Sequence, residues 1–337
     1  MTKKILYIGN NLSKHGYNKT YIEILGPLLE QEGFSVCYSS NKKNQLHRML
    51  DMIFTTLLNV KKVDCVIIDT YSTFGFYYTL ITSQICRLFN KKYIALLHGG
   101  NLPNRLKSHP FLSDLIFKNA YFLVAPSGYL LNAFKDHYSR NLLYIPNAIE
   151  LDKYTFQERN FDAPKLLWVR SFSSIYNPKM AIDVLSGIKK SYPNAALCMV
   201  GPDKENLIEA CKLHAEKLHL NVKFTGKLSK EEWIELSKQY TVFINTTHFD
   251  NTPISVIEAM ALGLAIVSTN VGGIPFLLTD KEHGLLVDDN DTTAMINAVD
   301  EIFKNAVVAK ERCVKSRKIV EYFDWNAVKQ KWIEILK

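Results

Sequence analysis

Short runs rich in apolar and β-branched residues alternate with helical patterns along this chain, and the alternation occurs twice. The first half contains KKILYIG, FSVCYSS, DCVIID, KYIALLH, YFLVAPS and NLLYIP. The second half contains KLLWVR, ALCMVG, VKFTG, TVFINT, LAIVST and GLLVDD. Strands that alternate with helices pair in parallel, and helices then cover both faces of the sheet. The sequence therefore predicts an α/β protein with two Rossmann-like, doubly wound domains.

The middle of the chain contains one polar stretch without clear periodicity, LDKYTFQERNFDAPK at residues 151–165, and we place the linker there. A chain of 337 residues that is 47% hydrophobic and 22% charged is long enough for two globular domains of ordinary size. We predict an N-terminal domain at residues 1–155 and a C-terminal domain at residues 160–320.

The cysteines and the N-terminus bear on the cellular compartment. Six cysteines are scattered through apolar contexts without a C-x-x-C pair, which is typical of reduced core residues in a cytosolic protein. The start, MTKKILYIG, has too short an apolar run for a signal peptide, and no run approaches the roughly 18 residues that span a bilayer. We expect a cytoplasmic protein, neither secreted nor integral to a membrane.

Charge is shared unevenly along the chain. Residues 1–160 hold 19 Lys and Arg against 11 Asp and Glu, whereas the remaining residues hold 22 of each. Such asymmetry indicates a negatively charged partner for the first domain, either an anionic membrane surface or nucleic acid. The aromatics of this half follow strand and helix patterns rather than an exposed basic groove, so we expect no nucleic acid.

Two segments of the basic half combine apolar and basic positions. Residues 46–62, LHRMLDMIFTTLLNVKK, predict an amphipathic helix with basic ends, and residues 104–118, NRLKSHPFLSDLIFK, are similar. Each segment fits a helix that lies on a bilayer. Each also fits an ordinary core-facing helix with solvated lysines, and both interpretations stay open.

The stretch from residue 248 to 275, HFDNTPISVIEAMALGLAIVSTNVGGIP, indicates a loop, a capped helix, a buried strand and a glycine turn. Thr252 is a candidate N-cap, Pro253 suits the first helical position, and Gly263 can end the helix. The first amides of this helix lack intrahelical acceptors and carry the positive end of its dipole. They form a natural site for phosphate, and they belong to Ile254, Ser255 and Val256.

Two acidic residues bracket this phosphate site. Glu258 lies one turn into a helix that is otherwise apolar, so we expect it to be buried and to need a partner. Ribose hydroxyls could be that partner, and so could a structural salt bridge. Asp250 precedes the helix, where it fits either a ligand contact or a loop and capping aspartate.

Polar residues directly after predicted strands are further candidates, because ligands of such folds bind beyond the carboxyl ends of strands. Arg170 ends the run KLLWVR, and Lys179 opposes the dipole at the start of the next helix. An anion between them would relieve that conflict. His98 ends the run KYIALLH before two glycines that permit close backbone approach. A surface arginine, a solvated lysine and a strand-end histidine are the alternatives.

The segment around Glu258 resembles the signature of family 4 retaining glycosyltransferases, which have the GT-B fold. That signature has two acids separated by seven residues, followed by E-A-M-A-x-G-x-P-V-V and then by V-G-G-x-x-E. The matching residues here are Asp250, Glu258, Ala259, Met260, Ala261, Gly263, Val267, Val271, Gly272 and Gly273. The resemblance implies two Rossmann-like domains that face each other across a cleft. The N-terminal domain would bind the acceptor, the C-terminal domain the nucleotide sugar, and a last helix at 322–337 would cross back to the first domain.

The same resemblance implies roles for single residues. Glu258 would hold the ribose, Asp250 the hydroxyls of the donated sugar, Arg170 and Lys179 the diphosphate, and His98 would face the donor. The predicted catalytic residues are therefore His98, Arg170, Lys179 and Asp250. The predicted residues for nucleotide-sugar binding are Gly16, Arg170, Lys179, Asn251, Thr252, Pro253, Ile254, Ser255 and Glu258.

Three positions depart from the family pattern. Asp250 stands where the family usually has Glu, which shortens the reach by one methylene. Val169 replaces a glycine before the arginine, and Ala265 replaces a frequent proline.

Gly16 belongs to the loop NNLSKHG after the first strand, which would face the acceptor side of the cleft.

These residues predict transfer of a sugar from a nucleoside diphosphate sugar, UDP in preference to GDP, to an acceptor hydroxyl. The resemblance implies that the transfer retains the anomeric configuration. The expected acceptor is a glycan or lipid-linked saccharide of bacterial polysaccharide biosynthesis, met at the inner face of the cytoplasmic membrane. We expect no cofactor and no metal, because Asp291 of the run Asp289–Asp291 is better interpreted as a helix cap than as a ligand. A non-catalytic nucleotide-binding subunit and a GT-B sugar-nucleotide epimerase remain the alternatives.

Overall fold

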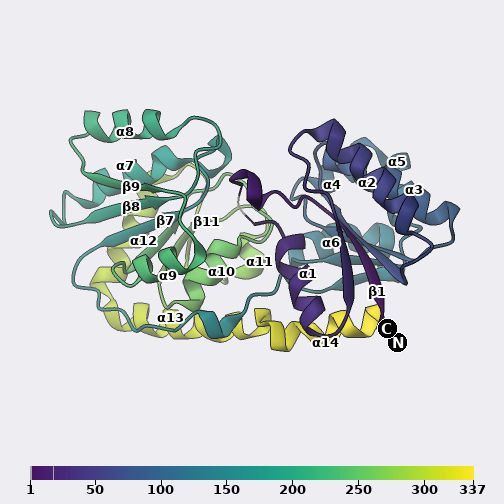
Figure 1. The fold of residues 1–337 in the computed structure, drawn as a ribbon. Helices are drawn as coiled ribbons and strands as arrows, with labels where there is room; N and C mark the ends of the chain where they lie inside the picture. Colours follow the sequence, from purple (N-terminus) through teal and green to yellow (C-terminus); the bar gives the residue numbers. More distant parts are fainter. Residues whose placement is uncertain (1, 18) are drawn as a thin grey trace. The chain divides into compact units, whose positions relative to one another are not determined.

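The chain divides into two compact units in the computed structural model, which describes residues 2–17 and 19–337 (Figure 1). The N-terminal unit comprises Met1–Ala148 and Trp325–Lys337, and the C-terminal unit comprises Ile149–Asp324. The division therefore falls a few residues before the predicted end at 155. The polar segment 151–165 belongs to the C-terminal unit because its aromatic residues Tyr154 and Phe161 are buried in that core.

The N-terminal unit is built on a parallel sheet in the order β2-β1-β3-β4-β5-β6. Its strands are β1 (Lys4–Ile8), β2 (Ser35–Ser39), β3 (Cys65–Thr70), β4 (Tyr93–Leu97), β5 (Phe122–Ala125) and β6 (Leu142–Tyr144). Its helices are α1 (Ile22–Gln31), α2 (Gln45–Asn59), α3 (Gly75–Leu88), α4 (Leu102–Ser108), α5 (Pro110–Phe117), α6 (Gly128–Tyr138) and α14 (Trp325–Leu336).

Successive residues of each strand of this sheet point to opposite faces, and each face is covered by helices. Leu6 and Ile8 of β1 pack with residues from α2 to α6, whereas Ile5 and Tyr7 pack with α1 and α14. Burial on both faces explains why the strands are apolar throughout rather than alternating. The final helix α14 therefore completes one face of the N-terminal unit.

The C-terminal unit repeats this architecture with the parallel order β12-β11-β10-β7-β8-β9. Its strands are β7 (Lys165–Val169), β8 (Ala196–Val200), β9 (Val222–Gly226), β10 (Val242–Asn245), β11 (Ala265–Thr269) and β12 (Leu285–Val287). Its helices are α7 (Pro178–Ile188), α8 (Ile208–Lys217), α9 (Lys230–Ser237), α10 (Ile254–Ala261), α11 (Ile274–Leu277), α12 (Thr292–Lys304) and α13 (Ala306–Val320).

The doubly wound fold predicted from the sequence is confirmed, because each apolar run of the two halves forms one strand of a parallel sheet. The cores lie on both faces of each sheet. Within the described residues, no helix combines the length and the apolar character that crossing a membrane requires.

The two amphipathic segments of the basic half have different outcomes. Residues 104–118 fall in the short helices α4 and α5, and Leu106, Ile116 and Phe117 of this segment are buried. The core-facing interpretation therefore holds for it. In α2, which covers most of residues 46–62, several leucines are instead exposed.

Candidate functional site

The sheet of the C-terminal unit reverses its winding direction between β7 and β10. The chain proceeds from β7 outward through β8 and β9, then returns to β10 on the other side of β7. In open α/β sheets ligands bind at the carboxyl ends of the strands at such a point. Arg170 follows β7 directly, and the loop that contains Asp250 follows β10, so the predicted residues occupy this position.

Arg170 and Asp250, to which the family resemblance assigned different parts of the donor, are in direct contact. Arg170 Nη2 lies 2.8 Å from Asp250 Oδ2, and Arg170 Nε donates to Asn245 Oδ1 at 3.2 Å. The guanidinium carbon is 5.0 Å from the centre of the Tyr176 ring. The two charged side chains are 11% and 17% exposed. The pair is thus positioned at the sheet edge with part of each charge open to a ligand.

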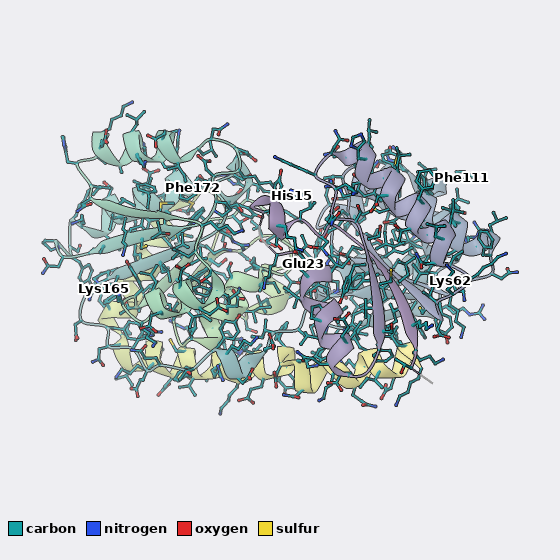
Figure 2. All side chains as sticks on the ribbon, in the orientation of Figure 1. His15, Glu23, Lys62, Phe111, Lys165 and Phe172 are labelled. Carbon is teal, nitrogen blue, oxygen red and sulfur yellow. The ribbon has the colours of Figure 1, made fainter. Side chains whose placement is uncertain are left out.

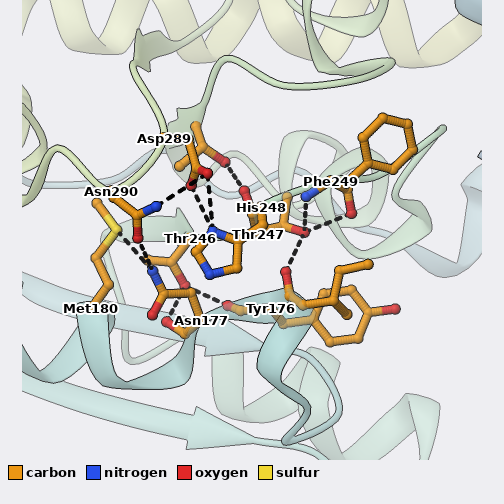
Figure 3. Close-up of polar contacts among 11 residues, drawn as sticks. Tyr176, Asn177, Met180, Thr246, Thr247, His248, Phe249, Asp289 and Asn290 are labelled. Atoms are coloured by element: carbon orange, nitrogen blue, oxygen red, sulfur yellow. Dashed lines mark hydrogen bonds and ion pairs between the residues drawn. The ribbon is translucent and has the colours of Figure 1, made fainter.

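Hydroxyl groups tie the loop after β10 to the loop after β7, as Figure 3 shows. Thr246 Oγ1 lies 2.8 Å from the carbonyl oxygen of Tyr176 and 2.9 Å from that of Asn177. Thr247 Oγ1 donates to the Ile175 carbonyl at 3.1 Å, and the His248 N–H donates to the same carbonyl at 2.8 Å. Sequence reasoning missed both threonines, because a hydroxyl after a strand is not distinctive by itself.

A second set of contacts accounts for the run Asp289–Asp291, and Figure 3 shows those of Asp289 and Asn290. Asp289 Oδ1 lies 2.8 Å from His248 Nδ1, and Asn290 Oδ1 accepts from Asn177 Nδ2 at 3.1 Å. Asp291 accepts from the Ala294 N–H at 2.7 Å and is the N-cap of α12, as predicted. These residues therefore hold loops together. In residues 2–17 and 19–337 no group of three or more His, Cys, Asp or Glu could hold a metal ion.

Helix α10 begins one residue later than predicted. Pro253 is the N-cap, with ψ 110°, and Ile254 is the first helical residue. Thr252 is consequently not the cap, because the extended peptide after Pro253 keeps the proline outside the helix. The Val256 N–H, predicted to be free, donates to the Pro253 carbonyl at 3.1 Å.

Several polar groups at the start of α10 have no protein partner. Among the residues that the structure describes, the N–H groups of Ile254 and Ser255 find no acceptor. The hydroxyl oxygens of Thr252 and Ser255 are buried and also unpaired. Buried polar groups in proteins are nearly always hydrogen-bonded, so two orphan hydroxyls beside two free amides indicate a binding site. The positive end of the helix dipole favours an anion there.

The predicted glycine turn supports the loop before α10. The Gly273 N–H donates to the Asp250 carbonyl at 2.8 Å. A Cβ atom on Gly273 would lie 1.6 Å from the Asn251 carbonyl oxygen, so no larger residue fits. Gly272 has φ +55°, in the left-handed region that favours glycine. The two glycines thus allow the backbone to pack directly against the loop of Asp250 and Asn251.

Glu258 is buried, as predicted, and it has two protein partners. The side chain is 4% exposed, the Tyr154 hydroxyl donates to its Oε1 at 2.7 Å, and the Lys230 ammonium contacts the same oxygen. Burial and the nearby Glu258 charge raise the pKa of Tyr154, so its hydroxyl stays protonated and can donate. Oε2 has no protein donor among the described residues. The structural salt bridge exists, and the ribose role of Glu258 stays a prediction.

Two arginines bind the other end of α10, and the sequence analysis missed both. Arg159 is 4% exposed, and its guanidinium donates to the carbonyls of Ser237, Tyr240 and Leu262. Burial lowers the pKa of Arg159 to about 10. Arg317 Nη1 donates to the Ala261 carbonyl at 2.7 Å. Cations at a helix C-terminus complement its dipole, and here they fix the position of α10.

Lys179 has a different environment from Arg170. It is the second residue of α7, after Pro178, and its side chain is exposed. Within the described part of the chain its ammonium has no ion-pair partner. The structure therefore leaves a cation at a helix N-terminus, the unfavourable placement noted in the sequence, without a protein group that compensates it.

The remaining predicted residues lie in the N-terminal unit, whose sheet reverses between β1 and β3. His98 Nε2 is 3.0 Å from Asp69 Oδ1, and Tyr7 donates to the same oxygen at 3.1 Å. The His98 ring stacks on Tyr71 with centroids 5.5 Å apart. Among the described residues Asp69 Oδ2 is buried without a partner, and burial together with this carboxylate raises the pKa of Tyr7. Sequence reasoning missed Asp69.

Gly16 ends the short 3-10 helix Ser13–His15 in an exposed turn with φ +87°. The loop is held by Glu23 of α1, which Figure 2 labels and whose carboxylate accepts from the N–H groups of Ser13 and Thr20. A separate pocket of about 430 Å³ in the C-terminal unit contains none of the predicted residues. Its lining includes Phe156, Arg159 and Val314.

The fold is that of the GT-B glycosyltransferases. It matches a sucrose-phosphate synthase from Thermosynechococcus elongatus with a TM-score of 0.78 and 16% identity over 99% of this chain and 98% of that one. It also matches the Anabaena protein HepE, solved in complex with UDP-glucose, with a TM-score of 0.76 and 16% identity over 99% of both chains. At this identity the likeness shows the shared fold.

Residues 152–319 match the family described as glycosyl transferases group 1, and the chain belongs to this family through its C-terminal unit. An uncharacterised glycosyltransferase of Methanocaldococcus jannaschii is 23% identical over 80% of this chain and 74% of its own length. Glycogen synthase of Mycobacterium tuberculosis is 22% identical over 55% of this chain. The chain spans 45% of the length of that synthase.

Proposed function

We propose that this chain transfers a sugar from a nucleoside diphosphate sugar to an acceptor hydroxyl, with retention and without a metal ion. The observation that carries the proposal is the start of α10. Two amides and two buried hydroxyls that have no partner in the described part of the chain gather there, four residues after the aspartate that contacts Arg170. Such a set of donors suits the oxygens of a diphosphate.

The proposed chemistry is electrostatic stabilisation of the leaving group. As the bond between the anomeric carbon and the diphosphate breaks, negative charge develops on the diphosphate, and Arg170, Lys179 and the α10 amides stabilise it. The acceptor oxygen forms the new bond to the anomeric carbon and passes its proton to a phosphate oxygen. Oε2 of Glu258 accepts a hydrogen bond from a ribose hydroxyl, and Asp250 accepts hydrogen bonds from hydroxyls of the sugar. His98 faces the donor.

The donor and acceptor are proposed on different grounds. HepE, which shares the fold, was solved with UDP and with UDP-glucose, and this supports UDP over GDP. Phosphatidyl-myo-inositol mannosyltransferase of Mycobacterium leprae, a lipid-modifying enzyme by name, is 23% identical over 55% of this chain and 50% of its own length. Together with the basic N-terminal unit, this supports a lipid-linked saccharide at the inner face of the cytoplasmic membrane.

A thermal-shift panel of nucleotides and nucleotide sugars tests the donor site. A ligand at 100 times its Kd stabilises the native protein by about 2.7 kcal/mol, so UDP should raise the Tm measurably. The shift should disappear in Arg170→Gln and persist in Arg140→Gln, an exposed arginine of the N-terminal unit. An unchanged shift in Arg170→Gln would contradict the proposal that the diphosphate binds beside Arg170. Incubation of a UDP-sugar with acceptor candidates, followed by product analysis, distinguishes transfer from epimerisation.

A further inference from the structure

Helix α2 presents its apolar side chains to the outside of the N-terminal unit. The outward residues are between 45% and 67% exposed and are Leu46, Leu50, Phe54, Leu57 and Leu58. Their spacing of three and four residues places them on one face of the helix. We call these five side chains the α2 stripe.

The opposite face of α2 accounts for its attachment to the unit. Met52 and Thr56 are buried against the core, and the helix packs on α3 and the sheet. Arg48 is also buried, where it donates to the Lys42 carbonyl at 3.0 Å and lies over the Tyr78 ring. An ordinary surface helix turns its leucines inward and its charges outward. Here an arginine faces inward and four leucines and a phenylalanine face outward, so the core does not explain the stripe.

The charges around the stripe are positive. Lys42 and Lys43 precede α2 and Lys61 and Lys62 follow it, and all four are exposed; Figure 2 labels Lys62. The one acidic residue between them, Asp51, is half-buried and accepts from the Ser39 hydroxyl. The N-terminal unit as a whole holds 20 Lys and Arg against 9 Asp and Glu, whereas the C-terminal unit holds 21 against 24.

We propose that the α2 stripe docks this protein on an anionic lipid bilayer, with the helix lying in the interface and its flanking lysines on the headgroups. An exposed apolar stripe with basic residues at both ends has the chemistry of interfacial helices. A second copy of this chain fits less well, because two strongly basic units would repel each other. Docking would bring the protein to the proposed lipid-linked acceptor. The biological purpose of docking therefore rests on the proposed function, whereas the docking itself is argued from the stripe and its lysines.

Sedimentation of the full chain with vesicles tests the docking. At low salt the protein should sediment with vesicles of phosphatidylglycerol and phosphatidylcholine, but not with phosphatidylcholine alone. The double substitution Leu50→Ser with Phe54→Ser should lower the partition coefficient by at least about 10-fold. Each substitution removes the favourable free energy of moving an apolar side chain from water into the bilayer. Leu213→Ser, at a leucine of α8 that is 57% exposed, is the matched control and should sediment as the wild type does.

Charge-reversal variants distinguish binding to anionic lipid from non-specific adsorption. Lys61→Glu with Lys62→Glu should weaken sedimentation several-fold, and Lys217→Glu with Lys238→Glu, at exposed lysines of the C-terminal unit, should not. Raising the salt to about 0.5 M should release the wild type, because ions screen the attraction. Melting curves confirm that each variant is folded.

Three results would overturn the inference. The first is that the Leu50→Ser, Phe54→Ser protein sediments as much as the wild type does, and the second is that the wild type does not sediment at all. The third is a dimer in light scattering that this double substitution abolishes. The UDP thermal shift measured on the same proteins keeps the two proposals separate. Its loss with intact sedimentation contradicts the donor site alone, and its presence without sedimentation contradicts the docking alone.

Discussion

Arg170 and Lys179 differ in how the protein holds them, although the sequence assigns both to one diphosphate. Arg170 is restrained by Asp250, Asn245 and Tyr176, so its guanidinium is already oriented. Lys179 is exposed and, in the described residues, unpaired. An oriented cation loses little freedom when a ligand arrives, whereas a mobile lysine must be ordered.

We predict that Arg170→Ala or Lys179→Ala lowers kcat by about 100-fold or more, as loss of an oxyanion donor typically does. Steady-state transfer from a UDP-sugar measures the effect. Lys190→Ala, at an exposed lysine just after α7, should retain wild-type turnover. Near-normal kcat in either site variant would refute the assignment of that residue.

Asp69 sets which nitrogen of His98 carries the proton. Because the carboxylate lies 3.0 Å from Nε2 and can only accept, Nε2 is the nitrogen that donates. In Asp69→Asn we expect a mixture of tautomers in nitrogen NMR and a fall in kcat of about 10-fold, the lower range for loss of a supporting contact. Tyr7→Phe removes the other hydrogen bond to Asp69 and should leave the His98 tautomer unchanged. An unaltered tautomer in Asp69→Asn would show that Asp69 only supports the core.

At the scale of elements, helix α10 is fixed at both ends. Arg159 and Arg317 bind its last carbonyls, and the glycine turn after β11 packs against the loop before its first turn. The orphan amides therefore point in a set direction before any ligand binds. Such preorganisation is what an anion site requires, since donors that are already aligned need no reorientation.

Gly273→Ala should disrupt this arrangement, because the added Cβ would lie 1.6 Å from the Asn251 carbonyl and the loop must move. We expect the apparent affinity for UDP, measured by thermal shift, to fall at least about 10-fold. The Tm of the free protein should fall as well, since backbone clashes of this kind destabilise strongly. Gly187→Ala in α7 is the control, because there the nearest atoms to the new Cβ belong to the side chain of Ile296 and not to the backbone. Undiminished UDP affinity in Gly273→Ala would mean that the turn does not shape the site.

At the scale of the whole molecule, the last helix belongs to the first unit. Helix α14 contributes Trp325, Val328, Trp332 and Leu336 to the core on one face of the N-terminal sheet. The chain thus begins and ends in the same unit. The stability of that unit depends on residues more than 170 positions away from the rest of its sequence.

Trp332→Ala should therefore destabilise the N-terminal unit by about 3–5 kcal/mol, the usual penalty for removing a buried tryptophan. Trp332 is fully buried, whereas Tyr322, 75% exposed in the C-terminal unit, provides the control Tyr322→Ala. Urea denaturation followed by circular dichroism measures both. Equal midpoints for the two variants would show that α14 contributes little to the N-terminal core.

The strands, and the residues that gather at the carboxyl end of the C-terminal sheet, could be predicted because their signals are local. Apolar runs of five or six residues, the spacing of Asp250 and Glu258, and the glycines of the turn are all visible over short windows of sequence. The one-residue error at Thr252 came from the same local view, because a proline fits both the cap and the first helical position.

The sequence by itself determined the alternation of elements, the excess of positive charge in the first half and the helix start where we propose that phosphate binds. Only the tertiary structure decided which distant groups meet, such as Lys230 with Glu258, Arg170 with Asp250, and Asp69 with His98. It also decided that the leucines of α2 face outward. Periodicity shows that a helix has an apolar face, but the side to which that face turns depends on what the rest of the chain packs against it.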